Sequence, residues 1–410
     1  MKKIGVYLDN EPYWGGAFQY NQSILDALAS LASTEYEIIV LYRYDLWLEY
    51  LKKYKFDACK ISIDKWSNLS SRILRKIMFL WNVPMYKYKK LFSIVDAIGK
   101  KVDRMHLDLM IYPSQEDMAL CNMTPSLSVI HDLMHRYEKF PEISGDRNYA
   151  NREILYKNIC ESSKGIFVDS ETGKKQVVDC YGIKYSSKLF VMPFTPPQYL
   201  FYTNSIPPKQ KLPPKYIFYP AQFWLHKNHK NLIKAVKILQ SKVHNMHLVL
   251  VGSRKNGYEE VCNLIKDLNL QNNVTILGYV SDEEMKYLYE HARAMIMASY
   301  CGPTNIPPLE GMAMGCPVAV SNVYGMPEQI GDAGLLFDPA SPDSIANCIE
   351  KLWEDDLLCA DLQKKGLERS KKFSQNMFNE RFKRAIELLC SSNSIGENNI
   401  SKTNKSGTLC

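Results

Sequence analysis

Short apolar runs separated by polar and amphipathic stretches recur along nearly the whole chain. Runs typical of buried strands cover residues 2–9, 37–42, 109–112, 128–130, 165–169, 216–220, 247–251, 274–277, 294–298, 317–320 and 335–337. Between them, apolar residues at helical spacing, such as Ile24, Leu25 and Leu28, indicate amphipathic helices. Strands that alternate with helices form parallel sheets, so the pattern predicts an α/β protein of the doubly wound kind.

Residues 196–214 interrupt this alternation with proline and polar residues, which is the composition of a linker. The 410 residues are also too many for one ordinary core. We therefore expect a first domain at 1–195 and a second at 215–373. An amphipathic stretch at 374–390 predicts a last helix, which we expect to pack back on the first domain. The polar tail at 391–410 is expected to be disordered.

The composition is that of an ordinary globular protein, with 46% hydrophobic and 23% charged residues. Asp9 interrupts the apolar run near the N-terminus, and no run of about 18 apolar residues occurs, so we predict neither a signal peptide nor a membrane-spanning helix. The 11 cysteines include no C-x-x-C pair, which argues against a zinc or redox site. Scattered cysteines fit a reducing compartment, and we expect the protein in the cytoplasm.

Positive charge is concentrated in residues 51–105, where fourteen basic residues accompany only four acids. Within this segment, residues 72–92 interleave aromatic and aliphatic residues with arginine and lysine. A basic amphipathic helix of this type suits an anionic membrane surface, here the inner face of the cytoplasmic membrane, or another anionic partner. A solvated basic face over an ordinary core explains the same pattern equally well. We expect no nucleic-acid partner, because the segment contains no recognised binding module.

The stretch from Ser299 to Ser321, SYCGPTNIPPLEGMAMGCPVAVS, combines the features of a ligand site. It leaves a strand through a proline-containing loop, enters a helix at Pro307 and Pro308, and continues into the next strand. The start of such a helix carries free N–H groups and a partial positive charge, so it suits an anion. Glu310, expected in the first helical turn, either complements the helix dipole or accepts hydrogen bonds from a ligand's diol, as acidic residues do for ribose.

Three further groups lie where strands end or helices begin, which is where α/β sheets bind ligands. Gly15 and Gly16 precede the first helix and allow close backbone approach. Lys227 stands at the start of a helix in the second half and suits a phosphate as a point charge. His131 follows a strand and can bind a sugar hydroxyl or transfer a proton. Its spacing to His135 resembles a metal pair, but a strand end is the wrong context, so we expect no metal site.

The second half of the chain resembles glycosyltransferase family 4, the retaining GT-B-fold enzymes that use nucleotide sugars. The matching motifs are GPTNIPPLEGMAMGCPVAVS, the segment GMPEQIGDAGLLFDP at 325–339, the loop AQFWLHKN and the turn GYVS. The first half is similar through its Gly-Gly loop, the His-Asp pair at 131–132 and the stretch VDSETGKKQVV. The resemblance covers most of residues 1–390 and is strongest over 215–340.

This resemblance implies two Rossmann-like domains that face each other across a cleft, the first for the acceptor and the second for the nucleotide sugar. It implies a retaining, metal-independent transfer of a sugar from a nucleotide diphosphate to a hydroxyl of a glycan or polyprenyl-linked glycan, with no bound cofactor. The chain looks like the mannosyltransferases that build bacterial O-antigen, capsule or lipopolysaccharide. The chain also contains no D-x-D motif, which the metal-dependent GT-A enzymes use.

Carried over residue by residue, the resemblance assigns catalytic roles to His131, Lys227 and Glu310. It assigns donor binding to Gly15, Gly16, Gln222, Lys227, Gly252, Ser253, Tyr279, Val280, Pro303, Thr304, Asn305, Ile306 and Glu310. Glu310 is expected to bind the ribose, Lys227 the diphosphate and His131 the donor sugar.

Two positions depart from the family pattern. Gly302 replaces the first glutamate of the E-x7-E motif that ends on Glu310, and Gln222 replaces the arginine five residues before the phosphate-binding lysine. Each lost charge-assisted hydrogen bond costs about 1.5–3 kcal/mol, or tenfold or more in affinity. Backbone N–H groups of residues 303–306 offer a replacement contact for the sugar. Two alternatives therefore stay open: a phosphorylase or non-lipid glycosyltransferase of the same fold, and a catalytically silent protein that binds nucleotide sugars.

Overall fold

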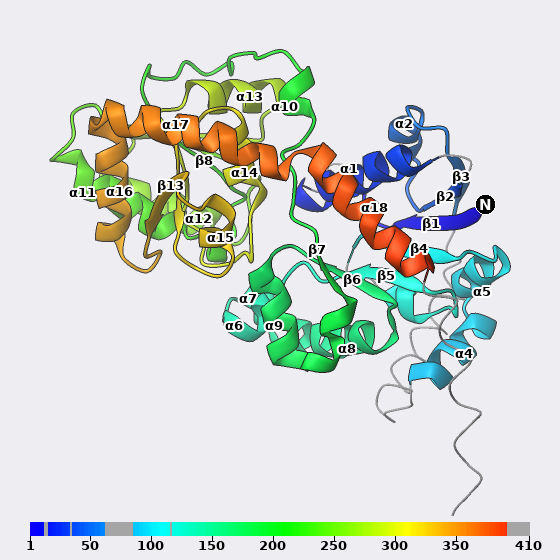
Figure 1. Ribbon diagram of the computed structural model, residues 1–410. Helices are drawn as coiled ribbons and strands as arrows, with labels where there is room; N and C mark the ends of the chain where they lie inside the picture. The colour runs from blue at the N-terminus through cyan, green and yellow to red at the C-terminus, as the bar shows by residue number, and fades with distance from the viewer. Residues whose placement is uncertain (12–14, 33–34, 62–84, 115–116, 392–410) are drawn as a thin grey trace, which may run out of the picture.

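Two parallel β-sheets, each flanked by helices, form two domains joined by a linker (Figure 1). The computed structural model describes residues 1–11, 15–32, 35–61, 85–114 and 117–391. The predicted disordered tail, apart from Ser391, and residues 62–84 of the basic segment therefore lie outside the described residues. Among the helices of the described ranges, none is long and apolar enough to cross a membrane.

The sheet of the first domain has seven strands in the order β3-β2-β1-β4-β5-β6-β7. They are β1 (Lys2–Leu8), β2 (Tyr36–Tyr42), β3 (Asp57–Lys60), β4 (Leu109–Tyr112), β5 (Ser126–Val129), β6 (Gly165–Val168) and β7 (Leu189–Val191). Neighbouring strands are parallel, with Ile4 of β1 beside Ile38 of β2. Successive side chains of β1 enter different core clusters, Val6 one and Tyr7 another, because both faces of the sheet are covered.

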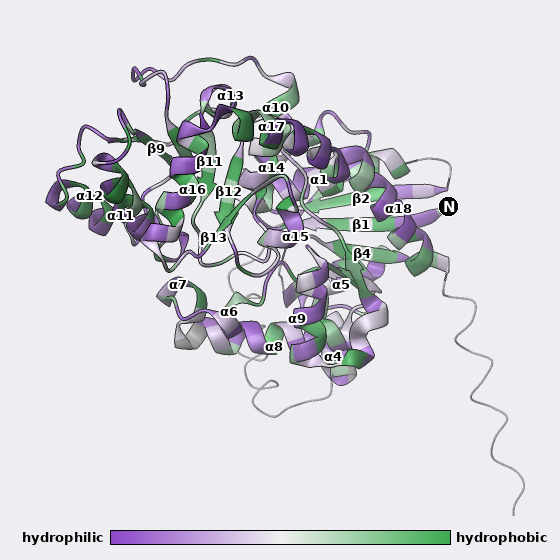
Figure 2. Cartoon of the chain, turned by 60° about the vertical axis from the view of Figure 1, so that its left-hand side comes forward, coloured by the Kyte–Doolittle hydropathy of each residue, from purple (hydrophilic) through white to green (hydrophobic). Residues whose placement is uncertain are grey.

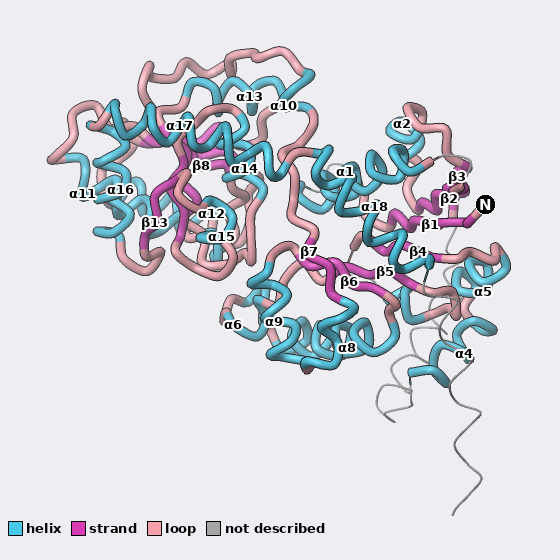
Figure 3. Tube along the Cα trace, in the orientation of Figure 1, coloured by secondary structure: helices cyan, strands magenta, loops and turns pink. Residues whose placement is uncertain are grey.

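The helices of the first domain lie on both faces of this sheet (Figure 3). They are α1 (Gly15–Leu31), α2 (Trp47–Leu51), α4 (Met85–Val95), α5 (Ala97–Arg104), α6 (Met134–Tyr137), α7 (Pro141–Ser144), α8 (Asp146–Ser162) and α9 (Glu171–Tyr181). Short polar side chains fix two of their starts. Asp96 accepts hydrogen bonds from the N–H groups of Ile98 and Gly99 before α5, and Ser170 caps α9.

The second domain repeats the arrangement with six strands in the order β10-β9-β8-β11-β12-β13. Its strands are β8 (Ile217–Pro220), β9 (Leu248–Val251), β10 (Val274–Gly278), β11 (Ala294–Met297), β12 (Val318–Ser321) and β13 (Gly334–Phe337). Its helices are α11 (His229–Gln240), α12 (Tyr258–Asp267), α13 (Asp282–His291), α14 (Ile306–Ala313), α15 (Met326–Ile330), α16 (Pro342–Glu354) and α17 (Asp356–Ser370), and α10 (Tyr199–Tyr202) lies in the linker before β8. Figure 2 shows the apolar strands of this domain between more polar helices, which is the pattern of a sheet buried on both faces.

The last helix, α18 (Gln375–Ser391), returns to the first domain and packs against α1 (Figure 1). Phe378, Phe382 and Ile386 on its buried face belong to the same apolar cluster as Phe18 of α1. The chain therefore passes between the domains twice, once through the linker and once between α17 and α18.

Direct hydrogen bonds also join the domains. The carboxylate of Glu328 in α15 accepts hydrogen bonds from the backbone N–H groups of Glu171 and Thr172, at 2.9 and 3.0 Å, so a side chain of the second domain caps α9 of the first. Glu142 of α7 accepts from the backbone N–H and the Nδ1 of His226, at 3.1 and 2.8 Å. These contacts hold the two sheets with their carboxyl ends around one shared cavity.

Candidate functional site

The shared cavity between the domains has a volume of about 890 Å³. Its walls come from the start of α1, the loops after β5, β8, β10 and β11, and the linker helix α10. The predicted site residues that line it are Gly15, Gly16, His131, Gln222, Lys227, Tyr279, Val280, Thr304, Asn305, Ile306 and Glu310. The structure thus brings together groups from both halves of the sequence, at the strand ends where open α/β sheets bind ligands.

Lys227 provides a positive charge in the wall of this cavity. Its Nζ donates to Oδ1 of Asn305 at 3.0 Å, and within the described residues it forms no ion pair. The hydroxyl of Tyr219 donates to the carbonyl of Lys227 at 2.5 Å, and the side chain of Asn228 bonds two more carbonyls, which fixes the loop. Burial lowers the pKa of Lys227 to about 8. A half-buried ammonium group without an acid partner suits an anionic ligand.

The start of α14 lies beside Lys227 and adds its partial positive charge. Asn305 precedes the helix in extended conformation, its N–H donates to Gln329 at 3.2 Å, and Thr304 bonds the buried carboxyl of Asp169 in the first domain. The helix begins at Ile306, one residue before the predicted start. Pro307 fits the first turn because the N–H that proline lacks would have no partner inside the helix at that position. Pro307 and Pro308 carry no N–H and the N–H of Asn305 is already bonded, so the helix start contributes mainly its partial positive charge, at the same cavity as Lys227.

Gly302, where the family that the sequence resembles has a glutamate, is required by the geometry of this loop. Its φ is +123°, a conformation that glycine adopts and L side chains avoid. A Cβ atom at this position would lie 2.3 Å from Nδ2 of Asn305. The side chain of Asn305 therefore occupies the space next to residue 302, and the loop is built around it rather than around a glutamate.

The first helix of the chain points its start at the same region. Gly15 has a φ of +53°. A Cβ at Gly15 would lie 3.9 Å from Nε2 of Gln222, and one at Gly16 would lie 3.3 Å from Cδ1 of Ile306. The N-termini of α1 and α14 therefore approach each other across the cavity, where both can stabilise negative charge.

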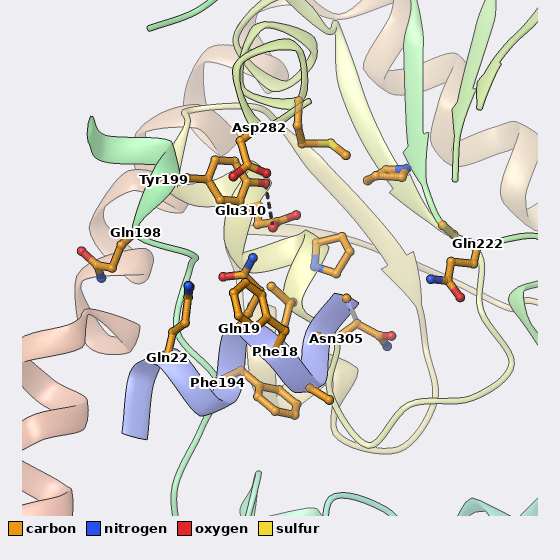
Figure 4. A pocket seen from close by; sticks show the side chains of 18 of the residues that line it. Phe18, Gln19, Gln22, Phe194, Gln198, Tyr199, Gln222, Asp282, Asn305 and Glu310 are labelled. Atoms are coloured by element: carbon orange, nitrogen blue, oxygen red, sulfur yellow. Dashed lines mark hydrogen bonds between the residues drawn. The ribbon is translucent and has the colours of Figure 1, made fainter. Parts of the chain in front are cut away.

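Glu310 lies deep in the cavity wall and accepts hydrogen bonds from two tyrosines, of which Figure 4 shows Tyr199. Tyr199 donates to Oε1 at 3.3 Å, and Tyr289 donates to Oε2. Because α14 starts at Ile306, Glu310 lies just beyond the first helical turn, contrary to our expectation. Burial raises its pKa to about 7. A buried carboxylate at a cavity wall is suited to accept hydroxyl hydrogen bonds, which favours the diol-binding interpretation over simple dipole complementation.

His131 is held as a neutral ring. Its Nε2 lies 3.1 Å from the carbonyl of Pro113, and since a carbonyl only accepts, Nε2 carries the proton and Nδ1 is an acceptor. Burial lowers the pKa of His131 to about 4. The ring therefore suits binding of a hydroxyl better than donation of a proton near pH 7. His135 instead bonds Glu153, and no cluster of three or more potential metal ligands occurs among the described residues.

Three residues that we predicted to bind the nucleotide-sugar donor do not line the shared cavity. Pro303 lines a neighbouring cavity of about 300 Å³, which also reaches His131 and Lys227. Gly252 and Ser253 line neither of these two cavities. A Cβ at Gly252 would lie 2.3 Å from the carbonyl oxygen of Ala221, and the carbonyl of Ser253 accepts from the N–H of Phe223. Gly252 and Ser253 pack neighbouring loops against each other. This differs from our prediction that they bind the nucleotide donor.

Sequence reasoning missed several residues that line the cavity or contact its wall. Tyr199 and Tyr289, which hold Glu310, come from the linker and from α13, and no sequence motif signals their approach. Asp282, at the start of α13, also lines the cavity. Its place next to the GYVS turn is the one signal that would have drawn attention to it.

Comparison with known proteins shows which families and structures this chain is similar to. Residues 203–369 match the family model of the glycosyl transferases group 1. The O-antigen chain mannosyltransferase B of Escherichia coli is 34% identical over 161 residues, which are 39% of this chain and 42% of that protein. The O-antigen chain mannosyltransferase RfbU of Salmonella typhimurium is 24% identical over 82% of this chain and 87% of its own.

Several of these alignments are partial, and the chain spans less than half the length of the first relatives that it matches. Among solved structures, Anabaena Alr3699/HepE in complex with UDP superposes with a TM-score of 0.70 at 14% identity, over 95% of this chain and 100% of that one. This likeness concerns the fold. Residues 203–369 are thus similar to the glycosyl transferases group 1, the fold is of the GT-B type, and the chain resembles O-antigen mannosyltransferases.

Proposed function

We propose that the chain is a retaining, metal-independent glycosyltransferase that moves a hexosyl unit from a nucleotide diphosphate sugar to a hydroxyl of a glycan or lipid-linked glycan. The observation that carries this proposal is the arrangement of Lys227 and the start of α14, which offer positive charge to one anion in a cavity between two domains. The mannosyltransferase names of the relatives favour mannose as the hexose and surface polysaccharide as the product.

The positions of the charged groups favour one direction for the donor in this cavity. Its diphosphate lies at Lys227 and the two helix starts, its ribose hydroxyls bond Glu310, and its sugar lies near His131 and the loop at 302–305. No metal and no bound cofactor are needed, because the lysine and the helix dipoles supply the charge that stabilises the leaving diphosphate. The lost arginine at Gln222 is offset in part by the approach of the Gly15–Gly16 helix start.

Retention requires bond formation and cleavage on the same face of the sugar. The acceptor oxygen bonds to C1 while the bond from C1 to the diphosphate oxygen breaks. The proton of the acceptor hydroxyl passes to that leaving oxygen, which lies next to it on the same face. His131, with Nδ1 as acceptor, holds a sugar hydroxyl in place and takes no proton in this scheme.

Retention at the anomeric carbon can be tested without a known acceptor, by following the slow hydrolysis of the nucleotide-sugar donor by water. We expect the protein with GDP-α-mannose, UDP-α-glucose or dTDP-α-glucose to release the α-anomer first, detectable by ¹H NMR before mutarotation. The rate should be the same in excess EDTA. Initial release of the β-anomer would contradict retention, and loss of activity in EDTA with recovery on adding Mg²⁺ or Mn²⁺ would contradict metal independence. Nucleotide binding without turnover of any donor would favour the silent binding protein, which Gln222 in the cavity wall motivates.

We further propose that the basic segment at 51–105 brings the enzyme to an anionic membrane surface, where a polyprenyl-linked acceptor resides. Its described helices α4 and α5 expose cationic and apolar side chains together, namely those of Lys87, Lys90, Ile94, Val95, Lys100 and Arg104. Such a surface gains both from charge attraction and from apolar insertion.

Vesicle flotation tests this membrane proposal. We expect the protein to float with vesicles of phosphatidylcholine and phosphatidylglycerol but to remain at the bottom with phosphatidylcholine alone. The double change Lys87→Glu and Lys90→Glu should abolish flotation while leaving donor hydrolysis unchanged, because both side chains are exposed and neither lines the cavity. Failure to float with either vesicle would exclude this role for the segment.

A further inference from the structure

A buried acid of the first domain, Asp169, contacts the loop at 302–305, which is the donor loop of the proposed function. Asp169 follows β6, its side chain is buried, and it lines neither of the two cavities. Its carboxylate accepts hydrogen bonds from the hydroxyl of Thr304, in the second domain, and from that of its own neighbour Ser170. The proposed reaction does not use this carboxyl group directly, so its role must be exerted through the donor loop.

The donor loop is tied to the groups that surround the anion site. Asn305, next to Thr304, accepts a hydrogen bond from Nζ of Lys227 at 3.0 Å. Gln329 of α15 bonds the backbone of Asn305 twice: its Oε1 accepts from the N–H at 3.2 Å, and its Nε2 donates to the carbonyl at 2.7 Å. A hydrogen bond that holds Thr304 therefore also fixes Asn305, Lys227 and the start of α15 relative to the first domain.

A second contact joins the same segments of the two domains. Glu328 of α15 accepts hydrogen bonds from the N–H groups of Glu171 and Thr172, at the start of α9. A Cβ atom at Gly325, just before α15, would lie 2.1 Å from the carbonyl oxygen of Pro303, so the donor loop packs closely against the start of α15. The donor loop, α15 and the start of α9 thus meet beside Asp169.

The buried setting strengthens the contact between Asp169 and Thr304. Burial raises the pKa of Asp169 to about 7, whereas the hydrogen bonds from Thr304 and Ser170 act in the opposite direction by stabilising the ionised form. Asp132, after β5, also disfavours this charge, and the negative charge of Asp169 in turn raises the pKa of the buried Tyr20 of α1. A hydrogen bond to a charged acceptor is stronger than one between neutral groups, so this contact favours the arrangement of domains seen here.

We propose that Asp169 is a positioning residue, which acts through Thr304 to hold the donor loop against the first domain while the donor reacts. The proposal rests on the proposed function, because that function assigns this loop to the donor. The residues assigned to the nucleotide, Lys227 and Glu310, belong to the second domain, whereas His131 belongs to the first. Loss of the contact should therefore impair the reaction, which needs both domains, more than it impairs binding of the nucleotide.

Donor hydrolysis and titration with GDP, the nucleotide product of GDP-α-mannose, test this role together. Thr304→Val keeps the shape of the side chain and removes the hydroxyl, so it should lower kcat about tenfold or more, the usual effect of losing a hydrogen bond to a charged group. It should change the Kd for GDP less than about threefold. Asp169→Asn should act in the same way, and the double variant should be no slower than the slower single variant, because one hydrogen bond links the two residues. Thr304→Ser, which keeps the hydroxyl, should stay within about twofold of the wild type.

A second threonine at the same interface provides the matched control. The hydroxyl of Thr172 also donates to an acid of the other domain, Glu328, at 3.0 Å, but this contact is exposed and does not involve the donor loop. Thr172→Val should change kcat less than about twofold, because water replaces an exposed hydrogen bond. A loss in Thr172→Val as large as that in Thr304→Val would show that any contact between the domains has this effect, which would overturn the specific role of Asp169.

The other outcomes separate this inference from the proposed function. An unchanged kcat in Thr304→Val, or losses that add in the double variant, would overturn the role of Asp169 while the glycosyltransferase assignment stands. A loss confined to the Kd for GDP, with kcat unchanged, would place Thr304 in nucleotide binding and would overturn it as well. The two variants of Thr304 decide the question if Asp169→Asn does not fold. If folded wild-type protein turns over no nucleotide sugar, the proposed function fails and the positioning role fails with it.

Discussion

Replacement of Lys227 by alanine is expected to lower kcat/KM for donor turnover by about 10²–10³-fold, the usual effect of removing one preorganised group that stabilises developing charge. The ammonium group lies in the cavity wall, bonded to Asn305 at 3.0 Å, and forms no ion pair within the described residues. Its removal therefore leaves no buried acid unpaired, and the protein should fold as before. Donor hydrolysis measured alongside thermal unfolding separates the two effects.

The pH dependence of GDP binding tests whether the positive charge of Lys227 is what supports donor binding. Burial lowers the pKa of Lys227 to about 8, so the ammonium form predominates below that pH and is lost as the pH rises through it. We expect the Kd for GDP to change little well below pH 8 and to rise by up to about tenfold per pH unit above it. Lys227→Arg should remove this rise, because a guanidinium group stays charged throughout the range.

A lysine close in sequence provides the matched control. Lys230 lies on the exposed face of α11, pairs with Glu260 and does not line the cavity. Lys230→Ala should change turnover less than twofold, because an exposed ion pair contributes little. A loss of activity in Lys230→Ala as large as that in Lys227→Ala would show that general positive charge, and not a specific contact, supports donor binding.

The parts of the fold that follow from sequence are those where burial imposes a pattern. β4 and β9 are buried at every position, so they appear as continuous apolar runs. The sequence does not predict β3, because its residues DACK are mostly exposed at the edge of the sheet and carry no apolar signal. The short strand β7 is likewise too brief to stand out from the segments around it. The α/β architecture of GT-B type is confirmed, since each sheet's central strands carry the pattern.

The residues of the candidate site also differ in whether a local sequence pattern predicts them. Lys227 and the Gly15–Gly16 pair lie at strand ends and helix starts, and Glu310 lies just past the first turn of α14, all positions that a local pattern reveals. Contacts between distant segments leave no such trace: the approach of Tyr199 to Glu310 depends on the path of the linker. Gly302 illustrates the limit most clearly, because its sequence suggests a lost group, whereas the positive φ and the packing of Asn305 make glycine a requirement of the loop.

Replacement of Glu310 by alanine is expected to weaken GDP binding about 100-fold or more, because two hydrogen bonds from ribose hydroxyls to a carboxylate, each worth about 1.5–3 kcal/mol, are lost together. The change also leaves the buried hydroxyl of Tyr289 without its acceptor, which costs about 1–3 kcal/mol in folding stability. Glu310→Gln keeps an acceptor for that hydroxyl, so it should unfold close to the wild-type temperature while still binding GDP about tenfold more weakly. Glu290→Gln, on the exposed face of α13, serves as the neutral control.

A double comparison isolates the ribose contact from any general disturbance of the cavity. Wild-type protein should bind 2′-deoxy-GDP about tenfold more weakly than GDP, and Glu310→Ala should bind both within twofold, because the group that distinguishes them is gone. Burial raises the pKa of Glu310 to about 7, so the carboxylate is lost as the pH falls through 7. The preference for GDP over its 2′-deoxy form should therefore shrink below pH 7 in the wild type and stay constant in Glu310→Gln. A preference that survives unchanged in Glu310→Ala would assign Glu310 to the support of Tyr199 and Tyr289 and place the ribose elsewhere.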